Sequence, residues 1–343
     1  MTNKGATGQP LADFLGRSEL AAVIAAVAEA AKPIADRIAR GALEGDPGAA
    51  LGDGASGDVH RALDVFTDEQ FERALRGARV RGFASEERAG PVELDADGKF
   101  LVSVDPLDGS SNLDVNLTVG SIVSVLDAPE RPGLEAHDFL QPGHCQRAAA
   151  VIVYGPHVDM LFTSGAGAHV ATYDRAAGEF RMVKRHIQIP EGKAEFAINA
   201  SNERHWPDPV RAYVADCLMG ESGPRGKEFN MRWIASLCAD ALRIFTRGGV
   251  YLYPDDSRAG YARGRLRLLY EANPIALLTE QAGGLATDGV NRILDITPGD
   301  LHQRTPLIFG STDKVDLIRS YFVEGHSSAS RSPLFGKRGL LRG

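Results

Sequence analysis

Eight residues, 105–112, constrain this 343-residue chain more than any other segment, because they place two aspartates and a turn at a strand end. They read Asp-Pro-Leu-Asp-Gly-Ser-Ser-Asn and directly follow the apolar run 100–104, which has the character of a buried strand. The acidic pair Glu86-Glu87 lies upstream. Crowded carboxylates repel one another, and burying them without partners is costly. The pattern therefore predicts a site for hard divalent cations such as Mg²⁺.

The turn after the second aspartate suits a phosphate group. Gly109, Ser110 and Ser111 offer backbone N–H groups next to an expected helix start, where anions are favoured. A cation and a phosphate in one place indicate phosphoryl transfer or hydrolysis. An ordinary Asp-rich turn would also contain Asp-Gly and Pro, but it would not explain the upstream Glu86-Glu87 pair.

The overall composition is that of a soluble globular enzyme, with 43% apolar and 24% charged residues. The 38 basic and 45 acidic residues give a formal charge of −7, which argues against general binding to nucleic acids or anionic membranes. Three widely spaced cysteines without a metal-binding spacing indicate a reduced, cytoplasmic setting. We see no signal peptide and no membrane span.

Apolar periodicity predicts an α/β chain in layers, with large, partly mixed sheets. Strands are expected at 80–84, 100–104, 119–126, 148–154, 158–164, 168–173, 196–201, 250–253, 266–270 and 307–311. Helices are expected at 18–38 with a kink or break at Pro33, then at 59–75, 207–219, 232–247, 273–281 and from 312 to about 323. Loops are expected at 44–58 and 128–145.

The polar segment 186–196 is a plausible boundary between two halves of the chain. We expect an N-terminal metal- and phosphate-binding subdomain over 11–195 and a C-terminal sugar-phosphate-binding subdomain over 196–324. The Ser-, Gly- and Arg-rich segment 325–343 is expected to be a flexible tail.

Four motifs carry a resemblance to a known family. They are Ser85-Glu86-Glu87, the segment 104–112, the segment 266–274 (Leu-Arg-Leu-Leu-Tyr-Glu-Ala-Asn-Pro) and Leu301-His302-Gln303-Arg304. From about Leu11 to Val323 the chain resembles class I fructose-1,6-bisphosphatase, of the metal-dependent, lithium-sensitive sugar and inositol phosphatase superfamily. The resemblance implies two subdomains in an αβαβα sandwich and a cytoplasmic homotetramer. It also implies fructose-bisphosphatase activity (EC 3.1.3.11), which gives fructose 6-phosphate and phosphate in gluconeogenesis or the Calvin cycle.

The same resemblance implies a set of site residues. Two or three Mg²⁺ ions, or Mn²⁺ in their place, would be held by Glu86, Glu87, Asp105, Asp108, Glu271 and the carbonyl group of Leu107. The catalytic set would be Glu87, Asp64, Glu86 and Asp108, with the Glu87–Asp64 pair assisting water activation. The sugar bisphosphate would be bound by Gly109, Ser110, Ser111, Asn202, Trp233, Tyr253 and Arg265, and by Arg232 of a neighbouring subunit.

Three positions depart from the family pattern. Arg265 stands where Lys is usual, and Trp233 and His205 stand where Tyr is usual. A Trp keeps the ring but loses the phenolic hydroxyl, so a phosphate hydrogen bond is lost or comes from elsewhere. These changes leave room for a second substrate, and sedoheptulose 1,7-bisphosphatase or a dual-specificity enzyme is the alternative.

Regulation also differs from that of animal members, which bind AMP through Gly-Glu-Leu-Thr and Lys-Tyr segments. Here the corresponding segments read Ser18-Glu19-Leu20-Ala21 and Lys99-Phe100, so the hydroxyls that would meet the nucleotide are missing. We expect weak or absent AMP inhibition. A redox switch like that of the light-regulated plant form is not expected, because Cys145 has no partner nearby in the sequence.

Three other classes of protein fit the sequence less well. An inositol monophosphatase would carry a Trp-Asp-x-Asp type motif, where this chain has Tyr270-Glu271 followed by Asn273-Pro274. A catalytically inactive sugar-phosphate sensor would be expected to lack at least one metal-binding carboxylate, yet all five are present. A nicotinamide-dependent oxidoreductase would need a glycine-rich turn, and the Gly165-Ala166-Gly167 segment lacks the third glycine.

Overall fold

The computed structural model describes residues 8–44, 50–53 and 59–324, and the expected tail 325–343 lies outside this part of the chain. The helices are α1 (Leu11–Leu15), α2 (Glu19–Arg40), α3 (Ala62–Leu75), α4 (Asp208–Leu218), α5 (Leu237–Arg247), α6 (Asn273–Gln281) and α7 (Thr312–Val323). The short helical turns that matter for the site are the 3₁₀ helix η2 (Ser110–Val115) and the π-helical turn η7 (Leu268–Ala272).

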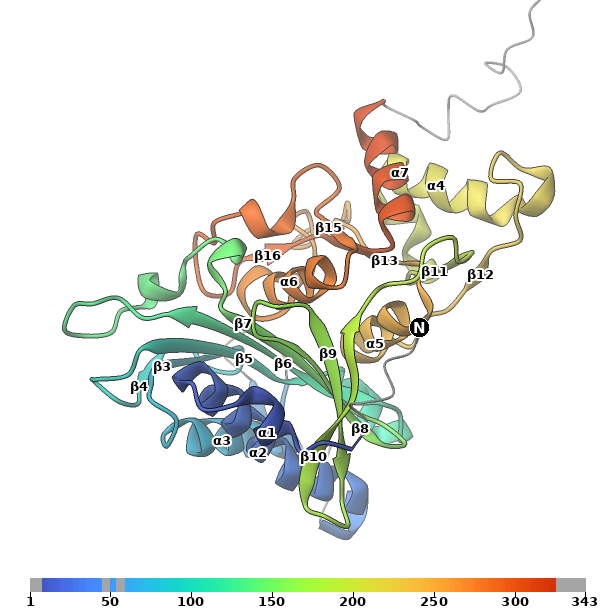
Figure 1. Cartoon of the computed structure of the whole chain (residues 1–343). Helices are drawn as coiled ribbons and strands as arrows, with labels where there is room; N and C mark the ends of the chain where they lie inside the picture. Colours follow the sequence, from blue (N-terminus) through green and yellow to red (C-terminus); the bar gives the residue numbers. More distant parts are fainter. Residues whose placement is uncertain (1–7, 45–49, 54–58, 325–343) are drawn as a thin grey trace, which may run out of the picture.

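Two sheets hold most of the strands (Figure 1). The first has the order β10 (Glu179–Ile187), β9 (Ala168–Asp174), β8 (Val158–Thr163), β7 (Ala148–Tyr154), β6 (Val119–Asp127), β5 (Phe100–Asp108), β3 (Val80–Ser85) and β4 (Val92–Glu93). The second has the order β12 (Asn230–Met231), β11 (Glu195–Ala197), β13 (Val250–Tyr253), β17 (Leu307–Gly310) and β15 (Leu285–Thr287). Two further pairs join β1 (Ala50–Asp53) to β2 (Val59–Arg61) and β14 (Leu266–Arg267) to β16 (Arg304–Thr305).

The sheets and helices form five layers in the order αβαβα. One buried apolar cluster joins α2 and α3 to one face of the first sheet. A second joins the opposite face to α5, α6 and the second sheet, and a third joins the outer face of the second sheet to α4 and α7. Each sheet thus has both faces covered, and the predicted layered α/β fold is confirmed.

The first sheet brings the two acidic motifs together. Strands β3 and β5 run parallel, and Ser85 at the end of β3 pairs with Val104 in the middle of β5. The N–H group of Glu86 donates to the Val104 carbonyl at 3.0 Å, so Glu86-Glu87 leave β3 beside Asp105 of β5. Because β5 is buried along nearly its whole length, its carboxyl end carries Asp105 into the interior.

Several predicted elements differ from the structure. Helix α2 runs unbroken through Pro33, because Ile34 and Ala35 pack into the core beyond it, so a break there was wrong. The predicted helix 59–75 begins at Ala62, after β2, and part of the expected loop 44–58 is β1. Strand β10 was missed, because exposed polar residues hide the alternation of its buried Phe180 and Met182.

Two differences lie beside the site. The predicted strand 266–270 is a two-residue strand that turns at once into η7, because Glu271 folds back onto the backbone of Arg267. The predicted helix 232–247 begins only at Leu237, where the Ser236 side chain accepts the Ala239 N–H as an N-cap. Residues 232–235 precede that cap outside the helix, and Ala235 adopts a left-handed backbone with φ of 64°.

Candidate metal and sugar-phosphate site

Three carboxylates from two distant segments meet at the end of β5. Asp105, Asp108 and Glu271 each offer an oxygen, and these oxygens all lie within 4.8 Å of one another. Asp105 and Glu271 are buried, while Asp108 is partly exposed. Glu86 and Glu87 are close enough for their charges to raise the pKa of Asp105 further. Three of the five predicted metal-ligating carboxylates thus form one cluster, and the charges of Glu86 and Glu87 act on it.

Asp108 is held by the start of α5. Its Oδ2 accepts the Ser236 hydroxyl and the Cys238 backbone N–H, each at 2.9 Å. The helix N-terminus favours a negative charge, so these two donors orient the carboxylate and oppose the effect of its burial. Asp105 is oriented more locally, since its Oδ1 accepts the Leu107 N–H at 3.1 Å.

Arg267 is a basic residue inside the acidic cluster. Its Nη1 lies 2.8 Å from Oε1 of Glu86, and its backbone N–H donates to Oε2 of Glu271 at 2.6 Å. The side chain is buried. Arg265, two residues earlier, contacts the ring of Tyr261 instead, so these two arginines serve different parts of the site.

The charge balance of the cluster fits a divalent cation. Burial, together with the neighbouring carboxylates, raises the pKa of Asp105 and of Glu271 well above their ordinary values. Burial also raises the pKa of Asp108. Oxygen ligands that are crowded and desolvated in this way match the preference of Mg²⁺ and Mn²⁺. A bound cation would offset the repulsion, so the residues present fit such an ion.

The predicted phosphate turn directly adjoins this cluster. Gly109 adopts a left-handed backbone with φ of 77°, which glycine accommodates without strain, and its carbonyl accepts the Asn112 N–H at 2.8 Å. Ser110 and Ser111 then open η2. Asn112 is buried, and its side chain donates to the carbonyl groups of Thr118 and Ala235. The turn is thereby fixed between β6 and the segment before α5.

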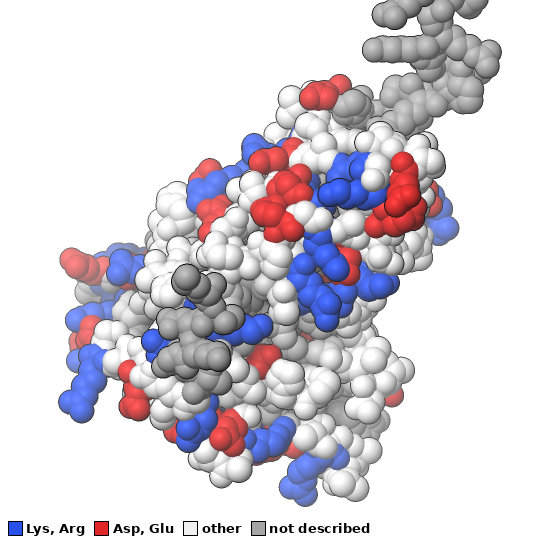
Figure 2. Space-filling view, turned by 45° about the vertical axis from the view of Figure 1, so that its right-hand side comes forward, with Lys and Arg blue, Asp and Glu red and all other residues white. Residues whose placement is uncertain are grey.

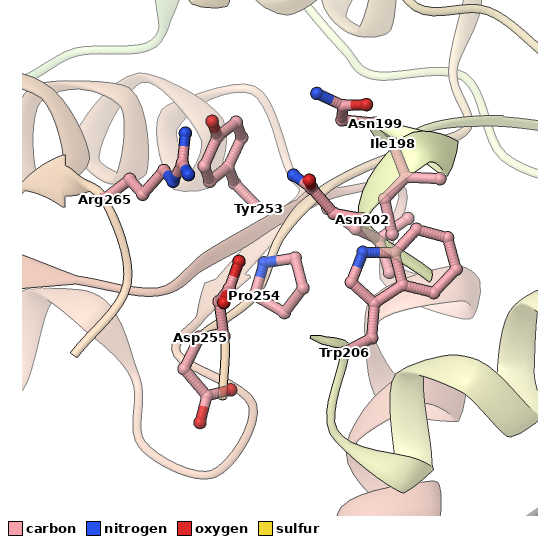
Figure 3. A pocket seen from close by; sticks show the side chains of 10 residues that line it. Ile198, Asn199, Asn202, Trp206, Tyr253, Pro254, Asp255 and Arg265 are labelled. Atoms are coloured by element: carbon pink, nitrogen blue, oxygen red, sulfur yellow. The ribbon is translucent and has the colours of Figure 1, made fainter. Parts of the chain in front are cut away.

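Three of the predicted sugar-binding residues line one small pocket. Asn202, Tyr253 and Arg265 line it, and Figure 3 shows the Arg265 guanidinium beside the Tyr253 ring, with Asn202 directed toward them. Burial raises the pKa of Tyr253; Arg265 opposes the shift and the Glu271 carboxylate adds to it. Arg265 of the pocket stands two residues before Arg267, whose Nη1 lies 2.8 Å from Oε1 of Glu86, so the short segment 265–267 joins the pocket to the carboxylate cluster.

The other predicted site residues lie on several different elements. The described residues that line the pocket do not include Trp233, whose ring stacks on Tyr251 with centroids 5.7 Å apart. Arg232 is exposed, and its Nη1 donates to the carbonyl of Met231 at 3.2 Å. Asp64 is buried in α3. His205 is half-buried beside Ser257, near the Asp256–Arg258 ion pair at the pocket edge.

Sequence reasoning missed the residues that hold the site together. Arg267 belongs to the motif 266–274 but was assigned no role of its own, although its position four residues before Glu271 was a usable signal. Ser236 and Cys238 lie 128 and 130 residues from Asp108, so no local pattern connects them. Trp206, which also lines the pocket, carried no signal at all.

Basic and acidic side chains lie next to one another over the face shown in Figure 2, as on a solvated surface. In the part of the chain that the structure describes, no helix combines the length and apolar character needed to cross a membrane. All three cysteines are free.

Comparison with known proteins places these features in a family. Residues 7–185 match the N-terminal domain and residues 189–323 the C-terminal domain of the fructose-1-6-bisphosphatase family. "Fructose-1,6-bisphosphatase class 1" of Methylobacterium radiotolerans is 48% identical over 350 residues, 100% of both chains. The protein of the same description from Azorhizobium caulinodans is 51% identical over 89% of this chain and 94% of its own.

Solved structures give the same result. The crystal structure of Leishmania major fructose-1,6-bisphosphatase in holo form superposes with a TM-score of 0.87 and 32% identity, covering 92% of this chain and 99% of the other. The T-state structure of that enzyme gives a TM-score of 0.82 at 31% identity, with 93% and 99% covered.

Proposed function

The chain belongs to the class 1 fructose-1,6-bisphosphatase family, and we propose that it hydrolyses fructose 1,6-bisphosphate to fructose 6-phosphate and inorganic phosphate. The observation that carries the proposal is the meeting of Asp105, Asp108 and Glu271 beside a fixed phosphate turn. A pocket lined by Asn202, Tyr253 and Arg265 is joined to this cluster by the segment 265–267. Those parts are what the hydrolysis of one phosphate of a sugar bisphosphate requires.

Each part of the site has a proposed role. Glu86, Glu87, Asp105, Asp108, Glu271 and the Leu107 carbonyl would hold two or three Mg²⁺ ions. When bound, these ions would polarise the 1-phosphate and lower the pKa of a water molecule. Glu87, with Asp64 behind it, would accept a proton from the attacking water. Amide N–H groups of Gly109, Ser110 and Ser111 would bind the phosphate.

The second phosphate and the sugar would be held from the other side. Asn202, Tyr253 and Arg265 line the pocket, and the planar fork of Arg265 suits a phosphate. Arg232 is exposed, so it is available to reach a neighbouring subunit. A shared residue of this kind supports the proposal of a homo-oligomer, with a tetramer as the family would suggest.

The division into subdomains 11–195 and 196–324 remains a proposal. It is supported by the two sheets, which take their strands from residues 80–187 and 195–310, and by the two family matches. We also propose a cytoplasmic location, supported by the three free cysteines. The proposed metabolic role is in gluconeogenesis or the Calvin cycle.

The test of the proposed function is phosphate release from fructose 1,6-bisphosphate, sedoheptulose 1,7-bisphosphate and inositol 1-phosphate. We expect release from the bisphosphates with Mg²⁺ and none with chelator or in Glu87→Gln. Equal efficiency on inositol 1-phosphate would contradict a working second-phosphate site. No release from any compound, with sugar-phosphate binding retained, would indicate a sensor instead.

The stacked Trp233 makes selectivity between the two sugars a separate prediction. Trp233→Tyr restores a phenolic hydroxyl, whose hydrogen bond stabilises a complex by about 0.5–1.5 kcal/mol. We therefore expect the ratio of kcat/KM for the fructose and sedoheptulose bisphosphates to change about two- to tenfold. Trp233→Phe is the matched control without the hydroxyl. A ratio that moves equally in both variants would exclude the hydrogen bond as the cause.

We expect AMP not to inhibit the enzyme at low micromolar concentration. Lys99 Nζ lies 2.7 Å from Oε2 of Glu19, and the Ser18 hydroxyl accepts the Ala21 N–H at 3.0 Å as the cap of α2. The side chains of Lys99, Glu19 and Ser18, at the positions that correspond to the AMP site of animal members, are thus bound to other groups of this chain. Initial rates measured with and without AMP, in the wild type and in Lys99→Ala, check this. A saturable inhibition curve that Lys99→Ala abolishes would refute it.

A further inference from the structure

Arg88, the residue directly after Glu86-Glu87, is bound to helix α3 by two carboxylates. Its Nε donates to Oδ2 of Asp68 at 2.7 Å, and its Nη2 lies 2.6 Å from Oε2 of Glu72. The Nη2 group also donates to Oδ2 of Asp68. The guanidinium lies over the ring of Phe83, 5.2 Å from its centroid, and Asp68 is buried. A planar fork held in this way is a stiff connection.

The backbone of Arg88 is fixed as well. Its N–H donates to the Ser85 carbonyl at 3.2 Å, and its own carbonyl lies 3.0 Å from Nε2 of His302. Three contacts therefore hold the turn Ser85–Arg88. The Glu86 N–H binds β5, the Arg88 carbonyl contacts His302, and the Arg88 guanidinium binds α3. Of these three ties, only the guanidinium reaches the helix that carries Asp64.

The spacing along α3 explains why this tie matters. Asp64 and Asp68 are four residues apart, so they lie on the same side of the helix, and both are buried. The Arg88 guanidinium binds Asp68, which lies one turn after Asp64 on α3. Glu87 directly precedes Arg88 in the chain. Moving the Arg88 contact would shift the Glu86-Glu87 turn relative to Asp64.

We propose that Arg88 is a positioning residue that fixes the Glu86-Glu87 turn against α3 and so sets the placement of the Glu87 carboxylate relative to Asp64. The inference rests on the proposed function, because it concerns residues to which that function assigns cation binding and water activation. Groups that orient metal ligands from behind typically change metal affinity or activity by 10–100-fold when they are removed. We expect Arg88→Ala to weaken cation binding and to lower kcat.

The test compares Arg88→Ala with Arg76→Ala. Arg76 pairs with the same Glu72, but its side chain is half exposed and points along α3. We expect Arg88→Ala to raise the half-saturating Mg²⁺ concentration about tenfold, measured as the Mg²⁺-dependent rise of Tm without substrate. Arg76→Ala should leave it unchanged. For the enzyme assay, kcat should fall about tenfold in Arg88→Ala, with the KM for sugar bisphosphate retained.

Two further variants separate positioning from folding. Arg88→Lys keeps the charge without the fork and should recover only part of the cation affinity. Asp68→Asn weakens the same contact without removing the side chain. The half-saturating Mg²⁺ concentration of the double variant Arg88→Ala with Asp68→Asn should be no higher than that of Arg88→Ala alone. A lower Tm with unchanged half-saturating Mg²⁺ in both Arg88→Ala and Asp68→Asn would overturn the proposal. A wild-type protein that binds Mg²⁺ without hydrolysing bisphosphates would instead overturn the proposed function.

Discussion

Asp105→Asn is expected to lower kcat/KM about 10³-fold and, in the absence of divalent cations, to make the folded protein more stable at neutral pH. The activity falls because the side chain at the centre of the cluster loses its negative charge. We expect the variant to lose about 4 kcal/mol of transition-state stabilisation, which corresponds to roughly three tenfold steps in rate.

The stability gain follows from the sign of the pKa shift. Burial and the neighbouring carboxylates raise the pKa of Asp105 in the folded state above its unfolded value. The native state then binds more protons than the unfolded state, so this group's contribution to stability is present at acid pH. It is lost as the pH rises through the folded-state pKa. An amide at this position has no charge to desolvate, so the loss does not occur.

Thermal unfolding at pH 5 and pH 8, with chelator and with Mg²⁺, checks this prediction. In chelator, the wild type should lose stability relative to Asp105→Asn between the two pH values. With Mg²⁺, the wild-type Tm should rise by mass action, and the rise should be smaller in the variant. Asp127→Asn, at an exposed aspartate, is the control. A variant that is inactive because it is unfolded in chelator would contradict the argument.

Local patterns predicted the parts of the site that neighbouring segments build, and not the long-range contacts. The run 100–104 and the acidic pair at 86–87 predicted a strand end rich in carboxylates, and parallel pairing of β3 with β5 puts them together. The contacts of Asp108 with Ser236 and Cys238 depend on how α5 packs against the first sheet. No spacing in the sequence encodes that packing.

The segment 266–270 shows a different limit. Its Leu-Arg-Leu-Leu-Tyr sequence alternates like a strand, yet only two residues pair with β16 before the chain turns into η7. The turn is favoured because it buries Leu268 and Leu269 and lets Glu271 accept the Arg267 N–H. A π-helical turn at a functional site overrode the local β propensity.

Arg267→Met is expected to destabilise the protein by about 3–5 kcal/mol in chelator, the range for removing one partner of a buried ion pair. The variant keeps the length of the aliphatic stem but leaves Glu86 without the charge that lies 2.8 Å away. The positive charge of Arg267 also opposes the rise in the pKa of Glu271, so this pKa should rise further in the variant. A raised carboxyl pKa weakens stability as the pH increases, so the gap from wild type should be larger at pH 8 than at pH 5.

The control for this prediction is Arg292→Met. Arg292 forms two ion pairs, 2.6 Å from both Glu280 and Asp295, but its side chain is 43% exposed. Solvent screens such pairs, so we expect a loss of no more than about 1 kcal/mol. Urea unfolding of both variants, with and without Mg²⁺, measures the difference. If Arg267→Met were no more destabilising than Arg292→Met in chelator, Arg267 would not be balancing the buried carboxylates. If the loss persisted unchanged with Mg²⁺, the cation would not share that role, because a bound cation should restore part of the missing positive charge.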